Sequence, residues 1–243
     1  MTEPLMIEFA GLTKQSLSDY PGRIAAVLFT RGCNLRCPFC HNPHLLGARR
    51  STGDQGWSLK DVLKLLEERK GFLDGVVITG GEPTLNPGLP SAIRLIKEMG
   101  YLVKLDTNGT GYEMVRELLQ EELVDYIAMD IKAPLDMAKY HKACGRLHSR
   151  EFLNIRNTIL MLKEAPIPVE FRTTVVPGLH TLKDIIDIAR QIQGASLYTL
   201  QQFRPEITLN PSFGKIVPFS AEELQQMALQ CSAFVKQVRV VNI

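Results

Sequence analysis

The sequence predicts an α/β fold with a parallel sheet, and three observations predict it. Six apolar runs suited to buried strands alternate with amphipathic helical patterns along almost the whole chain. Most of these runs are continuous rather than alternating, as is typical of strands covered on both faces. Polar residues gather directly after the runs, where parallel sheets place their active sites. No linker or composition break divides the chain, so we expect one domain over residues 1–243.

Hydrophobic periodicity gives the individual elements in order. The predicted strands are 24–30, 75–79, 102–106, 124–132, 168–176 and 196–203. The predicted helices, most of them marked by a capping residue or a terminal glycine, are 58–71, 89–100, 112–119, a segment within 150–162, 181–189 and 220–231. A long irregular loop is expected over 202–219. Six β–α units fit either an open doubly wound sheet or a barrel.

Composition and charge exclude several classes of protein. The chain has 28 Lys and Arg against 26 Asp and Glu, a net charge of +2, which gives no case for nucleic acid or an acidic membrane as partner. No apolar stretch approaches the ~20 residues that a membrane span needs. The amino-terminal stretch is acidic and lacks the features of a signal peptide, so we expect a cytoplasmic protein. Five cysteines, an odd number, argue against a disulfide framework.

Three of the cysteines, Cys33, Cys37 and Cys40, have the spacing C-x3-C-x2-C. Three thiolates on a short loop can hold three corners of an iron–sulfur cube and leave the fourth iron open to a small molecule. A complete four-cysteine set would instead favour electron transfer. We therefore interpret these cysteines as catalytic metal ligands.

Three other kinds of site fit part of this pattern. Zinc could take the three thiolates with His41 or His44, but the usual second pair of ligands is missing. The run from Cys37 to His41 also fits the C-x-x-C-H signature of c-type haem attachment, which leaves Cys33 unexplained. A redox C-x-x-C pair on a thioredoxin-like fold would need fewer β–α units. An iron–sulfur cluster accounts for all three cysteines.

The run C-N-L-R-C-P-F-C, with Phe39 before the third cysteine, resembles the cluster loop of radical S-adenosylmethionine (SAM) enzymes. Gly80-Gly81-Glu82-Pro83 resembles the second motif of that superfamily, and it follows the next predicted strand.

Other motifs are similar to the activating enzymes of glycyl-radical enzymes. They are the D-T-N-G at Asp106, the D-I-K at Asp130 and the V-V-P-G at Val175. The stretch Gly11 to Gly22, followed by R-G-C-N-L-R-C-P-F-C-H-N-P, most resembles the anaerobic ribonucleoside-triphosphate reductase activating protein group.

This resemblance implies a radical SAM fold, a partial (β/α)6 TIM-like barrel with parallel strands. It implies an oxidoreductase that uses a 4Fe-4S cluster to cleave SAM and generate a glycyl radical on anaerobic ribonucleoside-triphosphate reductase, with a flavodoxin- or ferredoxin-type reductant. The alternatives are an activase of another glycyl-radical enzyme, such as pyruvate formate-lyase, and a small-molecule enzyme such as a 7-carboxy-7-deazaguanine synthase. A zinc- or cluster-binding interaction protein is the non-enzymatic alternative.

The resemblance also implies a set of cofactor-binding residues. They are Phe39, Gly80, Gly81, Glu82, Asp106, Asn108, Asp130, Lys132 and His180. The two glycines would let the backbone approach the methionine part of SAM, or form a simple tight turn. Glu82 would compensate the ammonium of SAM or hold its own loop.

Asp106 and Asp130, at neighbouring strand ends, would share a monovalent cation beside the SAM carboxylate. Lys132 would otherwise be their partner or contact that carboxylate. An Asx-type cap is the alternative for Asp106. His180 would lie near the adenine or cap the next helix.

The remaining cysteines and histidines carry no assigned chemistry in the sequence. Cys231 lies on the apolar stripe of the last helix and is expected to be a core residue. Cys144 is loop-like and unassigned, and His41 is expected to bond within the cysteine loop.

Overall fold

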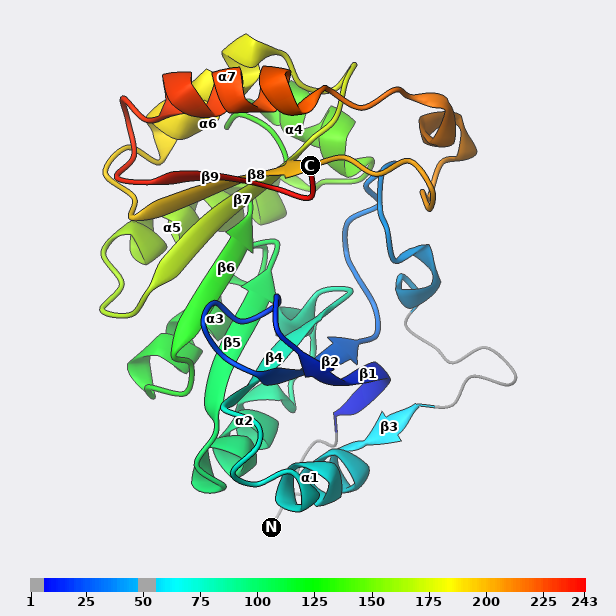
Figure 1. Cartoon of the computed structure of the whole chain (residues 1–243), viewed down its shortest axis with the longest axis vertical. Helices are drawn as coiled ribbons and strands as arrows, with labels where there is room; N and C mark the ends of the chain where they lie inside the picture. The colour runs from blue at the N-terminus through cyan, green and yellow to red at the C-terminus, as the bar shows by residue number, and fades with distance from the viewer. Residues whose placement is uncertain (1–6, 48–55) are drawn as a thin grey trace. The chain divides into compact units, whose positions relative to one another are not determined.

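The computed structural model describes residues 7–47 and 56–243 (Figure 1). Residues 1–6, the start of the acidic amino-terminal stretch on which the cytoplasmic expectation depends, lie outside this part of the chain. The described residues form two compact units. Unit 1 comprises residues 7–33, 44–47, 56–107 and 113–127, and unit 2 comprises 34–43, 108–112 and 128–243.

Unit 1 is built on strands whose hydrogen-bonded order is β3-β1-β2-β4-β5. The strands are β1 (Glu8–Ser16), β2 (Ala25–Thr30), β3 (Trp57–Ser58), β4 (Gly75–Gly80) and β5 (Leu102–Thr107). β2, β4 and β5 are parallel, whereas β1 pairs antiparallel with both β2 and β3. The helices that connect them are η1 (Pro43–Leu45), α1 (Leu59–Glu68), η2 (Pro83–Leu85), α2 (Leu89–Glu98) and α3 (Tyr112–Gln120).

Strand β6 (Tyr126–Asp130) begins in unit 1 and ends in unit 2. Unit 2 then adds three strands in parallel order, β7 (Val169–Val175), β8 (Leu197–Gln202) and β9 (Val238–Val241). Its helices are α4 (Met137–Cys144), α5 (Ser149–Lys163), α6 (Leu182–Gln191), η3 (Pro211–Lys215) and α7 (Ala221–Cys231). Figure 1 shows α6 and α7 together on one side of β8 and β9.

The six predicted strands are all present, and so are the six predicted helices. The hydrophobic runs of β4 and β6 are buried along almost their whole length, which explains why they are continuous in the sequence. Capping boxes at Ser58, Thr181 and Ser220 start α1, α6 and α7 where the sequence predicts. The predicted loop over 202–219 is irregular except for the short helix η3.

The unpredicted elements are the strands β1, β3 and β9, the helix α4 and the short helices η1, η2 and η3. β1 buries only Phe9 and leaves its other side chains partly or fully exposed, so it lacks the apolar run of a covered strand. β3 and β9 are short, with two and four residues. The predicted strand 124–132 is also longer than β6, which ends at Asp130.

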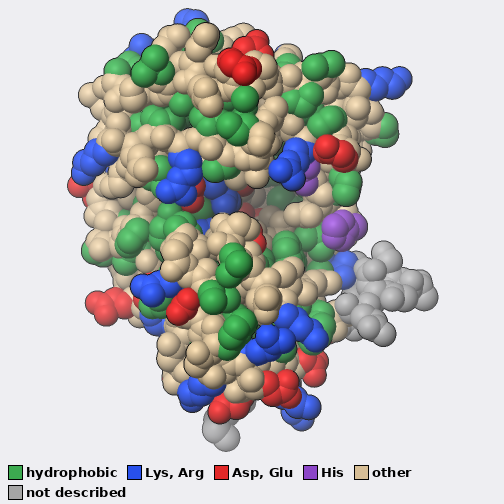
Figure 2. Space-filling view, in the orientation of Figure 1, with side chains coloured by type: hydrophobic (Ala, Val, Ile, Leu, Met, Phe, Trp, Pro, Cys, Tyr) green, Lys and Arg blue, Asp and Glu red, His purple; other side chains and the backbone are tan. Residues whose placement is uncertain are grey.

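Two surface properties follow from the side chains. On the face shown in Figure 2, acidic and basic side chains are interspersed among apolar ones, as the net charge of +2 suggests. Within residues 7–47 and 56–243, none of the helices has the length and hydrophobicity needed to cross a bilayer.

Candidate active site

The three motif cysteines lie on the loop that follows β2. Cys33 and Cys40 are partly exposed, Cys37 is buried, and none of them forms a disulfide. The Cys40 amide donates to the Cys37 carbonyl at 3.0 Å, so a tight turn joins the second and third cysteines. Phe39, between them, is buried at 3% exposure.

In unit 2 the cysteine loop is fixed by backbone hydrogen bonds to two other segments. The Arg36 amide donates to the carbonyl of Cys144 at the end of α4, at 2.8 Å. The Asn210 amide, in the long loop before α7, donates to the Pro38 carbonyl at 2.9 Å. Because segments distant in the sequence hold it from both sides, the loop is pre-organised rather than free.

Side-chain amides fix the same loop to the D-T-N-G motif. The Asn34 amide nitrogen donates to the Thr110 hydroxyl and to Glu151, both at 2.9 Å, and the Asn108 amide nitrogen donates to Asn34 Oδ1 at 3.2 Å. Asn108 Oδ1 accepts from the Thr110 amide, which makes an Asx turn. Asn108 thus makes an Asx turn within the motif, and the Asx-type cap named as the alternative for Asp106 stays a prediction.

The environments of Cys37 and Cys40 differ. A hydrogen bond from the Cys144 side chain lowers the pKa of Cys37 despite its burial, and the positive charge of Lys132 acts in the same direction. Burial raises the pKa of Cys40. The pKa values of these two thiols are therefore shifted in opposite directions by their surroundings.

Cys144 was unassigned in the sequence, and its place beside Cys37 was missed. It is the last residue of α4, which was not predicted, and it is fully buried. The signal that could have revealed the helix end is Gly145, which adopts φ +66° at the C-cap.

In unit 1 the G-G-E-P motif lies against the backbone that leads into Cys33. The Gly81 amide donates to the Thr30 carbonyl at 3.0 Å, and the Glu82 amide donates to the Gly32 carbonyl at 2.8 Å. Gly80 has φ +118°, and a Cβ there would lie 2.4 Å from the Thr30 nitrogen. The motif therefore needs glycine for a close approach between two segments of this chain.

Glu82 is buried and holds its own loop, which is one of its two predicted roles. Its Oε1 accepts hydrogen bonds from the Thr84 amide at 3.1 Å and from the Thr107 hydroxyl at 2.8 Å. The second bond ties the G-G-E-P motif to Thr107, the last residue of β5. Since Thr107 also belongs to the D-T-N-G motif, the two motifs are joined by this side-chain contact.

The carboxylates at the strand ends are each paired with a cationic side chain of their own unit. In unit 1, Lys104 Nζ lies 2.5 Å from Asp106 Oδ1. In unit 2, Asp130 accepts from Lys132 Nζ at 2.9 Å and from Arg172 Nε at 2.8 Å. Arg172 was not among the predicted site residues.

The ion pairs in unit 2 shift the pKa values of Asp130 and Lys132. Burial would raise the pKa of Asp130, but Arg172 and Lys132 hold it well below its usual value. Burial would lower the pKa of Lys132, but Asp130 raises it. The monovalent cation expected beside Asp106 and Asp130 stays a prediction, and each of these carboxylates has a cationic side chain beside it in its own unit.

His180 is buried, and both of its ring nitrogens bond to backbone. Nδ1 accepts from the Val176 amide at 2.9 Å, so Nε2 carries the proton and donates to the Lys132 carbonyl at 2.8 Å. Burial lowers the pKa of His180, in keeping with a neutral ring. The capping alternative is wrong, because Thr181 caps α6.

Two further residues considered in the sequence lie in unit 2. Cys231 is a core residue as predicted, with no exposed surface and its Sγ 3.7 Å from the Ile185 carbonyl oxygen. His41 is exposed and its ring centroid lies 6.2 Å from that of Phe203, so the expected bond within the cysteine loop is replaced by a ring contact.

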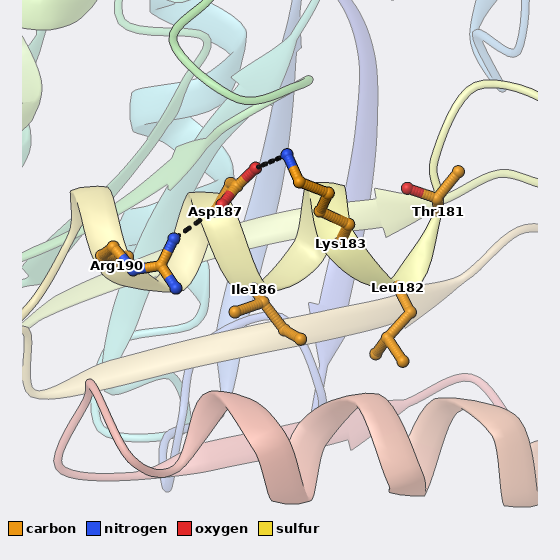
Figure 3. A pocket seen from close by; sticks show the side chains of 6 residues that line it. All are labelled: Thr181, Leu182, Lys183, Ile186, Asp187 and Arg190. Atoms are coloured by element: carbon orange, nitrogen blue, oxygen red, sulfur yellow. Dashed lines mark hydrogen bonds and ion pairs between the residues drawn. The ribbon is translucent and has the colours of Figure 1, made fainter.

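A groove of about 480 Å³ runs along the outer side of α6 (Figure 3). Asp187 pairs there with Lys183 at 3.2 Å and with Arg190 at 2.8 Å, whereas Leu182 and Ile186 point away from that row. None of the predicted site residues lines this groove, so we do not assign the chemistry to it.

The chain matches the Radical SAM superfamily over residues 27–192 and belongs to that superfamily. Membership implies a 4Fe-4S cluster and SAM. The predicted fold, a partial (β/α)6 TIM-like barrel with parallel strands, is confirmed at the level of the fold class. QueE from Escherichia coli has a TM-score of 0.57 over 97% of this chain and 92% of its own, at 15% identity.

Two relatives are similar in sequence. The chain is 34% identical over 236 residues to a candidate glycyl-radical enzyme activating enzyme of Methanocaldococcus jannaschii, a match that spans 96% of this chain and 95% of that protein. It is 36% identical over 184 residues to the pyruvate formate-lyase-activating enzyme of Clostridium pasteurianum, spanning 72% of this chain and 71% of that protein.

The donor set fits an iron–sulfur cluster better than a single metal ion. In the described part of the chain, no three His, Cys, Asp or Glu side chains converge as ligands of one ion. A cube does not require that, since each cysteine binds a different iron and the three sulfurs are spread around the cluster. The three cysteines form no disulfide and lie on one loop, and their thiols are the kind of donor that such a cube needs.

Proposed function

We propose that this protein is a radical SAM activating enzyme that generates a glycyl radical on anaerobic ribonucleoside-triphosphate reductase. The observation that carries the proposal is the similarity, over 96% of the chain, to a candidate glycyl-radical enzyme activating enzyme. The choice of the reductase rests on the resemblance of Gly11 to Gly22 and of the cysteine loop to that activating group. The protein would act in the cytoplasm, as one domain over residues 1–243, with a flavodoxin- or ferredoxin-type reductant.

In this proposal Cys33, Cys37 and Cys40 each bind one iron of the cluster. When bound, the cluster and SAM supply the electron transfer and the hydrogen-atom abstraction, which protein side chains cannot perform. The cysteine loop contributes by its anchoring: hydrogen bonds to Arg36 and Pro38 fix where the sulfurs lie. Phe39 shields the loop from water, in keeping with its burial.

The charged group at the ends of β6 and β7 is proposed to bind the SAM carboxylate. Lys132 and Arg172 place two positive charges beside the carboxylate of Asp130, and all three side chains lie at the ends of these strands. His180 is proposed to position Lys132 through the hydrogen bond to its carbonyl rather than to contact the adenine.

The motifs of unit 1 are proposed to contribute to the cofactor site as well. Gly80 and Gly81 bring the end of β4 close to the backbone that precedes Cys33, and Glu82 locks its own loop to Thr107. Asp106 is proposed to bind cofactor with Lys104 as its counter-ion. In unit 2, Asn108 is proposed to act through Asn34, on the cysteine loop.

The test is radical formation on the partner. Reduced, anaerobically reconstituted protein with SAM and the reductase from the same cell should give the glycyl doublet in electron paramagnetic resonance (EPR). A reductase whose carboxyl-terminal glycine is replaced by alanine should give none, and neither should the Cys33→Ala variant. The Cys231→Ala variant, altered in the core, is the matched control and should behave as wild type.

A different result would change the assignment. Rapid SAM cleavage with a doublet on pyruvate formate-lyase alone would identify another activase. Cleavage with no doublet on any glycyl-radical protein of that cell would favour a small-molecule substrate. Bound zinc and no SAM binding would end the enzymatic proposal.

A further inference from the structure

The carboxyl end of α4 lies against the middle cysteine of the motif. Cys144, its last residue, has no exposed surface and its side chain hydrogen-bonds to the Cys37 sulfur. Its carbonyl accepts from the Arg36 amide at 2.8 Å, one residue before Cys37. Main chain and side chain of Cys144 thus contact the same short segment of the cysteine loop.

This placement is fixed by the backbone and not by the sulfur contact alone. Gly145 caps α4 with φ +66°, and its amide donates to the His141 carbonyl at 2.9 Å. A Cβ at Gly145 would lie 2.2 Å from the Arg36 carbonyl oxygen. The helix end approaches the loop too closely for any side chain, so the Cys144 thiol is held beside Cys37 by the fold.

We propose that Cys144 is a positioning residue that donates its thiol hydrogen to the Cys37 sulfur and thereby raises the reduction potential of the cluster that Cys37 binds. The inference rests on the proposed cluster but not on the identity of the partner protein. Reduction adds negative charge that spreads onto the cysteine sulfurs, and a hydrogen bond to a sulfur stabilises that charge. Cys144 therefore eases the uptake of the electron on which SAM cleavage depends.

Cys144 is assigned as a donor and not as a fourth ligand. The motif supplies three thiolates, and a fourth would occupy the iron that must stay open for SAM. The backbone contact of Cys144 with Arg36 and the close approach of Gly145 to the same residue place this thiol beside the cysteine loop. A thiol there supplies a directional hydrogen bond to the sulfur of Cys37.

The experiment measures the cluster and not the enzymatic activity. Wild type, Cys144→Ala, Cys144→Ser and the core control Cys231→Ala are reconstituted anaerobically, and their iron and sulfide contents are compared. The midpoint potential is then measured by EPR-monitored redox titration of each isolated protein. Circular dichroism melting of the apo proteins separates misfolding from an effect on the cluster.

The Ala variant should keep the full cluster but show a more negative potential. At a fixed potential we expect its ratio of reduced to oxidised cluster to fall about threefold; a tenfold fall would correspond to ~59 mV in a one-electron couple. The Ser variant, which keeps a donor, should lie closer to wild type, and Cys231→Ala should match wild type. In D2O the Fe–S stretching bands should shift more in wild type than in Cys144→Ala, which keeps only the backbone donors to Cys37 and Cys40.

Equal potentials in wild type and Cys144→Ala, in properly folded protein, would overturn the inference. Loss of the cluster in both the Ala and the Ser variant would also overturn it, since Cys144 would then be a ligand. Neither result changes the expected glycyl radical signal on the reductase. Conversely, if that signal were absent, the difference in cluster potential between wild type and Cys144→Ala could still be measured. The proposed function and the role of Cys144 can therefore be disproved independently.

Discussion

A side chain on Gly81 would place its Cβ 1.9 Å from the carbonyl oxygen of Gly32. Gly32 directly precedes Cys33, and its carbonyl accepts the Glu82 amide at 2.8 Å. The G-G-E-P motif and the start of the cysteine loop are therefore packed backbone to backbone. Gly81 is therefore required for this packing of backbone on backbone, in addition to the approach of SAM predicted from the sequence.

This contact gives a prediction for Gly81→Val. The side chain must push away backbone and not a flexible group, so we expect a loss of about 1–3 kcal/mol in the free energy of unfolding and reduced cluster incorporation. Denaturant unfolding of the apo protein and iron content after reconstitution measure both effects. Gly11→Ala, whose Cβ would meet the Phe29 side chain at an ordinary 3.5 Å, is the control and should change little. A Gly81→Val protein with full iron and weak SAM binding would instead support a role confined to the cofactor.

The ligand assignment gives a second prediction. Replacing Cys33, Cys37 or Cys40 with Ala should abolish cluster retention, because two thiolates cannot hold a cube with one open iron. Absorbance and iron content after anaerobic reconstitution measure this. Cys231→Ala should retain the cluster, since its thiol lies in the core against α6. If Cys231→Ala lost its cluster while Cys33→Ala kept it, the ligand set would be wrong.

The parallel strands could be predicted because burial on both faces leaves a continuous apolar run in the sequence. The same rule fails for β1, where Phe9 is buried but the other residues of the strand are partly or fully exposed. It also fails for α4, whose buried residues Tyr140, Ala143 and Cys144 form too short and weak a stripe to mark a helix. Elements without a strong apolar period need tertiary contacts to be recognised.

In the candidate site, too, some features could be predicted from a local sequence pattern and others depend on tertiary contacts. The cysteines and the glycine pair are local motifs, and the sequence alone indicates their chemistry. The contact of Cys144 with Cys37, and that of Arg172 with Asp130, join residues far apart in the chain. No local pattern predicts such pairs, because only the packing of helices and strands brings them together.

A third prediction concerns pH and the start of α6. Burial would raise the pKa of Asp184, but hydrogen bonds from Lys139 and Thr181 lower it to about 2. A carboxyl whose pKa is lower in the folded than in the unfolded protein stabilises the fold at pH values above its unfolded pKa of about 3.9. This stabilisation is lost as the pH falls toward its folded pKa of about 2. Asp184→Asn should therefore cost about 1–2 kcal/mol at pH 6, and the difference from wild type should shrink between pH 4 and 2.

Urea unfolding of the apo proteins at several pH values measures this difference. Asp187→Asn is the control on the same helix. It removes the ion pairs with Lys183 and Arg190, two mostly exposed side chains, and should cost no more than ~0.5 kcal/mol. If the loss in the free energy of unfolding caused by Asp184→Asn were the same at pH 2 as at pH 6, the contribution of Asp184 to the capping box would not depend on its negative charge.

The last prediction concerns the charged group formed by Asp130, Lys132 and Arg172. Asp130 accepts hydrogen bonds from both of these cations. Asp130→Asn would remove the negative charge that pairs with them in a largely buried place, so we expect a loss of about 2–3 kcal/mol in the free energy of unfolding. Lys132→Met should cost less, because Arg172 still pairs with the carboxylate. The double variant should be more stable than the sum of the single losses implies, by about 1 kcal/mol, since removing Lys132 relieves the repulsion that Asp130→Asn creates. Denaturant unfolding of wild type, the two single variants and the double variant, all without cofactor, completes this double-mutant cycle. Strictly additive losses would show that the charges do not act as one group, and Lys132 would then lose its proposed place beside the SAM carboxylate.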